Sequence, residues 1–289
     1  MISRLHNLIK QSKEIIEDKD DYEFTYEDET EIDYPEITKL DHENTSNPKS
    51  TPIKKGLRKK QVDLDKFLFE DPNIIEIGVD EAGRGPLFGR VYTAAVILPK
   101  DDSFDHFKMK DSKKFYSKKQ IDETAEYIKK NALAWYVGFE DEKTIDQINI
   151  LQATQQSMHK SILGVKNIYN NKKRHISDSD NLYYLLIDGN YFNPLINLNK
   201  NTNKLVSMPY SCIEGGDNKY TAIAAASILA KVERDKYIQE MCIEHPELIE
   251  KYSIDNNKGY GSKQHLDGIR SHGITPWHRR SFGICSKYT

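Results

Sequence analysis

Apolar residues gather into short runs after residue 72, and each run predicts a strand. β-branched and apolar side chains dominate residues 73–80, 91–99, 132–140 and 182–190, a pattern typical of strands that are buried in a sheet. Only a short glycine-rich link separates the first two runs. We therefore expect these two strands to be antiparallel neighbours.

Three segments among these strands predict helices. Residues 116–131 have amphipathic spacing with Ser117 as the N-cap, and residues 144–165 place apolar side chains at helical intervals. Residues 217–235 are rich in alanine, so this helix can pack closely on a sheet. Two strands, a helix, a strand, a helix, a strand and a helix in this order predict a mixed α/β sandwich.

The first part of the chain has a different composition. Residues 1–70 lack sustained apolar periodicity, and a basic run at 54–60 follows an acidic and then a polar stretch. We predict an N-terminal extension of low order over 1–70 and one folded domain over 71–289. The extension is either a solvated tail or a segment that shields a basic groove, holds nucleic acid or acts as an import signal.

The net charge of the whole chain hides an uneven distribution. Residues 14–43 contain fourteen acidic and two basic side chains, so this stretch carries −12. Since the chain as a whole carries −3, the remainder carries +9. A positive domain attracts polyanions, although a charged surface can also be merely solvated.

Several classes of protein are excluded by composition. No run approaches the roughly 20 apolar residues that a membrane-spanning helix needs, and the N-terminus has no apolar core typical of a secretory signal. The three cysteines, Cys212, Cys242 and Cys285, stand singly, which argues against a disulfide framework. We expect a monomer in the cytoplasm that has no membrane partner.

Four carboxylates stand where predicted elements end or begin. Asp80 and Glu81 end the first strand, Asp188 ends a later one, and Asp217 begins the alanine-rich helix. Any one of them alone is a cap or turn residue. Together, at one edge of a sheet, their charges repel unless they are protonated or neutralised by a cation. Hard oxygen ligands favour Mg²⁺ or Mn²⁺, and a pair of such ions supports in-line attack of water on a phosphodiester.

A glycine-rich loop follows the first two carboxylates. Its spacing over residues 83–89 is GxGxxxG and a strand follows it, so it is not a dinucleotide-binding fingerprint. The glycines either form a tight turn or let backbone amides approach a sugar or phosphate.

The C-terminal stretch 256–283 interleaves basic and aromatic side chains, which suits a phosphate backbone and a stacked base or sugar. It also contains His265, His272 and His278, seven and six residues apart, without a carboxylate-backed ligand pattern. We interpret them as core or surface histidines rather than zinc ligands.

Taken together, these motifs resemble those of ribonuclease HII, the type 2 ribonuclease H, over roughly residues 73–285. The form DEAGRG favours this family over its ribonuclease HIII relatives. The segments that carry the resemblance, in the order of the family, are IGVDEAGRGPLFG at 77–89, DSKK at 111–114, IDGN at 187–190, GGD at 215–217, AIAAASILAKVERD at 222–235, and GYGSKQH at 259–265 with HRRSF at 278–282.

The resemblance implies a ribonuclease-H-like α/β fold with a five-stranded mixed sheet, flanking helices and a helical C-terminal part. It implies an endonuclease that hydrolyses RNA within RNA–DNA hybrids or at ribonucleotides embedded in a DNA duplex. The products would carry 5′-phosphate and 3′-hydroxyl ends, and the cofactor would be Mg²⁺ or Mn²⁺.

The family's functional residues correspond to positions in this chain. The catalytic and metal-binding carboxylates match Asp80, Glu81, Asp188 and Asp217. In the same way, the substrate-binding positions match Gly83, Arg84 and Gly85, whose backbone would bind the ribose 2′-hydroxyl, and Tyr260, which would stack on the following sugar.

Two lysines each have two alternative roles. We expect Lys113, like Arg84, to contact phosphates, with a plain surface position as the alternative. Lys231 either orients the site or pairs with Asp235 one helical turn away.

Two alternatives to this function remain at the level of the sequence. One is a nucleic-acid-binding module that has lost catalysis, which turnover on a labelled duplex would exclude. The other is a different metal nuclease of the same fold, such as a resolvase-like enzyme, which would cut an all-DNA junction equally well.

Overall fold

The computed structural model describes residues 63–110, 115, 117–173, 182–199 and 203–288. The chain divides into two units, 1–62 and Asp63–Thr289, and the described residues all belong to the second. Most of the predicted N-terminal extension therefore lies outside the described residues, as does Lys113. Within the second unit, residues 63–70 contact the remainder of that unit: Phe69 is buried, and the Asp65 amide donates to the Lys219 carbonyl at 2.8 Å.

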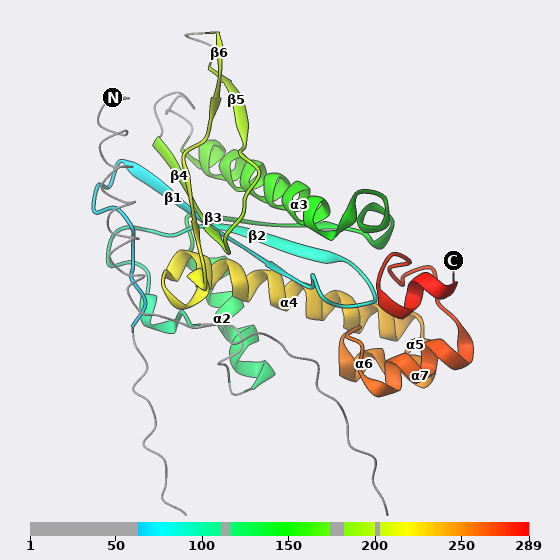
Figure 1. The fold of residues 1–289 in the computed structure, drawn as a ribbon. Helices are drawn as coiled ribbons and strands as arrows, with labels where there is room; N and C mark the ends of the chain where they lie inside the picture. The colour runs from blue at the N-terminus through cyan, green and yellow to red at the C-terminus, as the bar shows by residue number, and fades with distance from the viewer. Residues whose placement is uncertain (1–62, 111–114, 116, 174–181, 200–202, 289) are drawn as a thin grey trace, which may run out of the picture. The chain divides into compact units, whose positions relative to one another are not determined.

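A five-stranded mixed sheet forms the centre of this unit, as the resemblance implies (Figure 1). The β1–β2 and β2–β3 pairs are antiparallel, which confirms the predicted pairing of the first two strands, and the β1–β4 and β4–β7 pairs are parallel. In spatial order the strands are β3 (Ala134–Glu140), β2 (Val91–Ile97), β1 (Ile74–Ala82), β4 (Leu182–Asp188) and β7 (Tyr210–Ile213).

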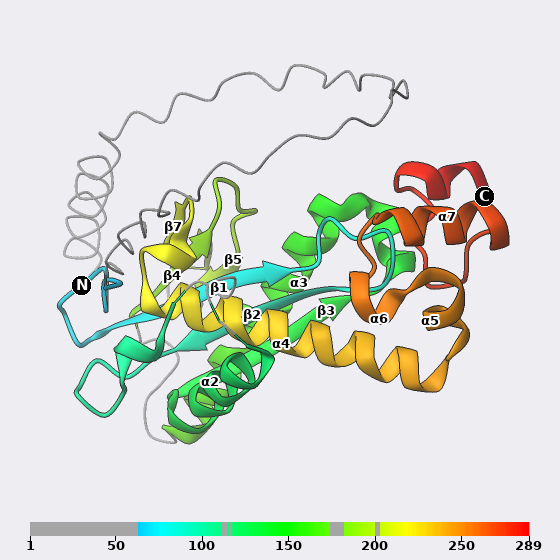
Figure 2. The same cartoon turned by 90° about the horizontal axis from the view of Figure 1, so that it is seen from below.

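Helices cover both faces of the sheet, and the central strands are therefore buried on both sides. Helix α3 (Glu142–Lys172) lies on one face, and α2 (Lys118–Asn131) and α4 (Thr221–Glu244) lie on the other (Figures 1 and 2). Along β2, Ala95 packs in the cluster with α3, whereas Ala94 packs in the cluster with α2 and α4. This alternation is what an extended chain with period two produces.

Helix α4 packs closely on β1 because the side chains on both sides of the contact are small. A Cβ atom built at Gly78 would lie 2.2 Å from the backbone carbon of Ala222, so only glycine fits there. Ser117 caps α2 as predicted, accepting a hydrogen bond from the Gln120 amide. One helix boundary was predicted wrongly: α4 begins at Thr221, and Asp217 lies in the short 3₁₀ helix η3 (Gly216–Asn218) before it.

The C-terminal part is helical, as the resemblance implies. Its elements pack around a separate core with Phe88, Tyr237 and Ile269. They are α5 (Glu247–Tyr252), α6 (Ile254–Asn257), α7 (Lys263–His272) and the 3₁₀ helix η4 (Gly283–Tyr288). Another 3₁₀ helix, η1 (His106–Lys108), precedes α2. No helix within the described ranges has both the length and the hydropathy of a membrane span.

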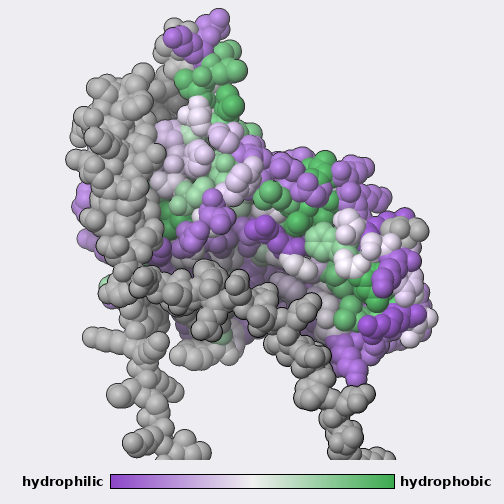
Figure 3. Space-filling model, in the orientation of Figure 1, coloured by the Kyte–Doolittle hydropathy of each residue, from purple (hydrophilic) through white to green (hydrophobic). Residues whose placement is uncertain are grey.

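A two-stranded hairpin that the sequence analysis did not predict projects from the sheet (Figure 1). It consists of β5 (Ile196–Asn199) and β6 (Lys204–Ser207), paired antiparallel. Apolar side chains such as Leu198 and Leu205 are exposed on it, and Figure 3 shows hydrophobic surface over this projection.

Candidate active site

The strand register brings two of the predicted carboxylates side by side. Strands β1 and β4 run parallel with Val79 opposite Ile187, so the next residues along, Asp80 and Asp188, lie at the same level on neighbouring strands. Val79 and Ile187 pack in the cluster with α3. Because side chains alternate, Asp80 and Asp188 point to the opposite face, which α4 covers.

The other two carboxylates join them from adjacent segments. Glu81 follows Asp80 in β1, and Asp217 lies in η3, between β7 and α4. The Gly216 amide next to Asp217 donates to Asp188 Oδ1 at 2.7 Å, which fixes η3 against the end of β4. The charges of Glu81 and Asp188 act on Asp80, and that of Asp217 acts on Asp188, so the four predicted carboxylates are neighbours around the ends of β1 and β4.

The charges in this carboxylate cluster disfavour one another. Burial, followed by the charges of Glu81 and Asp188, raises the pKa of Asp80 well above its usual value, and the Asp80 side chain is only 4% exposed. Burial and then the charge of Asp217 raise the pKa of Asp188. Burial also raises the pKa of Glu81, and the nearby Arg84 opposes that shift from 3.3 Å away.

Neutral hydrogen bonds hold Asp80 in place. Its Oδ1 accepts from the Glu81 amide at 2.7 Å. A further hydrogen bond from Ser227 of α4 lowers the Asp80 pKa, although by less than burial and the neighbouring charges raise it. Ser227 was not identified from the sequence, because a serine in an alanine-rich helix gives no signal of its own.

These side chains suit a hard divalent cation. Across the described ranges, no three Asp, Glu, His or Cys side chains already converge as ready-made metal ligands. The cluster nonetheless supplies carboxylate oxygens, the donors that Mg²⁺ and Mn²⁺ prefer. After burial, the charges of Glu81 and Asp188 raise the pKa of Asp80 and the charge of Asp217 raises that of Asp188, and a cation would offset this repulsion.

The glycine-rich loop lies beside this cluster. Gly83 has φ +90°, and a Cβ atom there would lie 2.1 Å from Nε of Arg234, so the position requires glycine. Gly85 is exposed, and its nearest neighbour for a Cβ atom is the ring of Tyr260 at 3.5 Å. Tyr260 is 50% exposed. The structure therefore places the predicted loop and the predicted tyrosine next to each other.

Other residues singled out in the sequence have structural surroundings. Lys231 Nζ lies 3.4 Å from Asp235 Oδ2, which is the ion pair along the helix. His265 and His278 are buried, with their Nε2 atoms 3.0 Å apart, whereas His272 is exposed. The first two are core histidines, as the sequence indicated.

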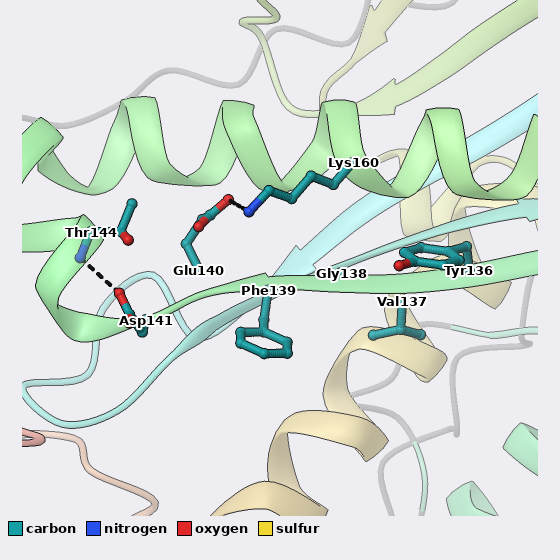
Figure 4. A pocket seen from close by; sticks show the side chains of 8 residues that line it. All are labelled: Tyr136, Val137, Gly138, Phe139, Glu140, Asp141, Thr144 and Lys160. Carbon is teal, nitrogen blue, oxygen red and sulfur yellow. Dashed lines mark hydrogen bonds and ion pairs between the residues drawn. The ribbon is translucent and has the colours of Figure 1, made fainter.

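A hollow of about 270 Å³ lies elsewhere, between β3 and the start of α3 (Figure 4). Within it Lys160 pairs with Glu140 at 2.6 Å, and Asp141 accepts from the Thr144 amide at 2.8 Å. None of the four clustered carboxylates lines this hollow.

Comparison with known proteins identifies the family. The family model described as ribonuclease HII matches residues 77–285, which include the four carboxylates, the loop and Tyr260. The chain belongs to the ribonuclease HII family. The chain is accordingly an endoribonuclease of the hydrolase class, and ribonucleases H degrade the RNA of RNA–DNA hybrids.

Individual relatives agree with this placement. The ribonuclease HII of Parabacteroides distasonis is 42% identical over 210 residues, covering 73% of this chain and 90% of the relative. That of Bacteroides thetaiotaomicron is 42% identical over 214 residues, with 73% and 91% covered.

Solved structures show the same fold. Ribonuclease H2 from Pyrococcus horikoshii matches with a TM-score of 0.53 at 21% identity, over 74% of this chain and 96% of that one. The ribonuclease HII in a complex with PCNA from Archaeoglobus fulgidus matches with a TM-score of 0.51 at 22% identity, over 73% and 96%.

Proposed function

We propose that this member of the ribonuclease HII family is a metal-dependent endonuclease that hydrolyses the RNA strand of RNA–DNA hybrids and cuts at single ribonucleotides embedded in DNA. Its products carry 5′-phosphate and 3′-hydroxyl ends. The observation that carries the proposal is the buried carboxylate cluster at the ends of β1 and β4, beside the loop 83–89.

The four carboxylates are the proposed catalytic and metal-binding residues. Asp80, Glu81 and Asp188 hold the cofactor, Mg²⁺ or Mn²⁺, and Asp217 completes the set from η3. When bound, one or two such ions neutralise the cluster and supply the positive charge that activates water and stabilises the leaving 3′-oxygen. The hydrogen bonds to Asp80 and Asp188 fix the orientation of both groups before substrate arrives.

The loop and Tyr260 are the proposed readers of the sugar. The 2′-hydroxyl is the group that distinguishes RNA from DNA at one nucleotide. Gly85 presents an exposed backbone next to the cluster, and the half-exposed ring of Tyr260 offers a surface for stacking. Arg84 is exposed beside Glu81, where it is able to contact a phosphate, and Lys113 is proposed for the same contact.

Cleavage of three labelled duplexes tests the proposal. We expect cuts in a continuous hybrid and at a single embedded ribonucleotide, none in an all-DNA duplex, and no cutting when divalent ions are chelated. Asp188→Asn should lower the rate by about a hundredfold or more, whereas the control Asp102→Asn, at an exposed carboxylate in a turn, should retain it.

Other results would contradict the proposal. Wild-type rates from Asp80→Asn or Asp188→Asn, or cutting that persists in a chelator, would refute the metal site. Binding without any turnover would favour a module that has lost catalysis. Equal cutting of an all-DNA junction would favour a resolvase-like enzyme.

We propose further that the protein acts as a monomer in the cytoplasm. Three unpaired cysteines, of which Cys242 and Cys285 are buried, fit a reducing compartment. Sedimentation of the purified chain, with the duplex added and without it, tests the monomer, and fractionation of cells tests the location.

A further inference from the structure

One buried arginine, Arg279, is hydrogen-bonded through its side chain to the glycine-rich loop 83–89. Arg279 is 0% exposed, and its guanidinium donates to four backbone carbonyls of the loop. The acceptors and distances are Gly83 O at 2.6 Å from Nη2, Arg84 O and Pro86 O both at 2.8 Å from Nη1, and Gly89 O at 2.8 Å from Nε.

These contacts also set the direction of the loop's amides. In a trans peptide unit the C=O and the following N–H point in opposite directions. Because the carbonyls of Gly83 and Arg84 turn inward to Arg279, the amides of Arg84 and Gly85 turn away from it. Both residues are exposed, and within the described chain neither amide donates to a protein acceptor. Two adjacent free donors beside the carboxylate cluster are a binding element for an oxygen atom.

Backbone hydrogen bonds also hold the second half of the loop, where the guanidinium contacts Pro86 and Gly89 as well. Leu87 donates to the Gly259 carbonyl and accepts from the Arg279 amide, each at 2.8 Å, and the Gly89 amide donates to Trp277 O at 2.8 Å. At Gly83 and Arg84 the carbonyls accept from the Arg279 side chain, so this side chain sets the orientation of these two peptide units. Lysine cannot perform it, because one ammonium nitrogen cannot reach four carbonyls arranged around a planar fork.

We propose that Arg279 is a positioning residue for recognition of the ribose, aiming the amides of Arg84 and Gly85 at the 2′-hydroxyl. This inference rests on the proposed function. It also changes the interpretation of the C-terminal basic stretch, because Arg279 is buried and contacts the loop rather than a phosphate.

The charge of Arg279 is retained at neutral pH. Burial, with a smaller effect of the neighbouring charge of Arg234, lowers the pKa of Arg279 to about 9. Near pH 7 the guanidinium is protonated and each of its nitrogens is a donor, so its hydrogen bonds to the loop persist at physiological pH.

Binding that is measured without cleavage tests the proposal. In the Asp188→Asn background, affinities are measured by fluorescence anisotropy, with Mg²⁺ present, for a duplex with one ribonucleotide and for the all-DNA duplex of the same sequence. Arg279→Lys should lower the ratio of the two affinities by about fivefold to tenfold, the value of one or two hydrogen bonds. The affinity for all-DNA should be unchanged. The matched control Arg270→Lys, at an exposed arginine paired with Asp267, should leave the ratio intact.

The outcomes separate this inference from the proposed function. If the unsubstituted chain cuts the ribonucleotide duplex but Arg279→Lys keeps the ratio, or lowers both affinities equally, Arg279 has no positioning role. If the unsubstituted chain does not cut, the proposed function itself fails. Should Arg279→Lys unfold, the selectively labelled amide of Gly85 in the unsubstituted chain decides by NMR. That amide should shift with the ribonucleotide duplex and not with all-DNA, and equal shifts would overturn the proposal.

Discussion

Replacing Asp80 by asparagine should make the metal-free protein more stable while it inactivates the enzyme. Asp80 and Asp188 lie at the same level on adjacent strands, and neighbouring strands of a sheet are about 4.8 Å apart. Two charges about 5 Å apart repel by about 3 kcal/mol at an effective dielectric constant of 20. Asparagine has the same shape and can still accept from the Glu81 amide and bond to Ser227, so most of this repulsion should be relieved without a new cavity.

The expected gain in the free energy of unfolding is about 1–3 kcal/mol at pH 7.5 with divalent ions chelated. For a unit of this size, 1 kcal/mol raises the melting temperature by about 2–4 °C. Adding Mg²⁺ or Mn²⁺ should then stabilise the wild type more than Asp80→Asn, because an ion that binds only the folded state stabilises it in proportion to its affinity. Calorimetry of both chains, with and without the ion, measures the two effects.

A matched control and a contrary result make this prediction specific. Asp102→Asn removes one exposed carboxylate, so it should change neither the metal-free melting temperature nor the response to the ion. If Asp80→Asn melts below the wild type without metal, the carboxylates do not repel one another as their burial implies. The electrostatic argument for the metal site would then be refuted.

Three further predictions follow from other parts of the molecule. Burial and the neighbouring charges raise the folded-state pKa of Asp80, so the cost of its charge in the folded state is lost as pH falls from that raised pKa toward the ordinary value of 3.8. The metal-free advantage of Asp80→Asn should therefore shrink as the pH is lowered in urea unfolding, and an advantage that stays constant down to the ordinary pKa would contradict the shift. Gly83→Ala should destabilise the chain by about 2 kcal/mol or more and impair cleavage, because φ of Gly83 is +90° and Arg234 occupies the space of the new methyl group. The control Gly85→Ala should fold normally. Equal melting temperatures of the two variants would show that the loop is not held as described. Asn149 has φ +66° inside α3, and its side chain caps the following turn by accepting a hydrogen bond from the Gln152 amide. Asn149→Ala should therefore lower the free energy of unfolding by about 1 kcal/mol and leave cleavage unchanged. A loss of cleavage without a loss of stability would contradict this prediction.

The strands and the carboxylates at their ends were predictable because the signal is local. An apolar run that stops at Asp80 or at Asp188 marks both a buried strand and its end, and the short link after Glu81 allows only an antiparallel return. The placement of Asp217 depends instead on a turn. Gly215 has φ +60° and begins η3, which separates Asp217 from the alanine-rich helix. A run of alanines does not reveal where its first helical turn starts.

Other features depend on contacts that span the chain. Arg279 looks like a surface residue because it stands among basic and aromatic neighbours, and only its contact with Gly83, 196 positions away, shows that it is buried. The hairpin β5–β6 went unpredicted for a different reason. Its polar residues mask the alternation, and no packing on the main sheet reinforces its few apolar side chains such as Leu205.

The long separation between Arg279 and the loop has a consequence for synthesis. Ribosomes add about 5–20 residues per second, so after Gly83 is made, roughly 10–40 s pass before Arg279 exists to meet it. Throughout that interval the nascent chain already contains Asp80, Glu81 and, later, Asp188 and Asp217, but the loop beside them lacks its anchor. Ribosome-bound chains that stop short of Arg279 would lack the side chain that holds the carbonyls of Gly83 and Arg84, so the loop would reach its folded geometry only as the final helices are translated.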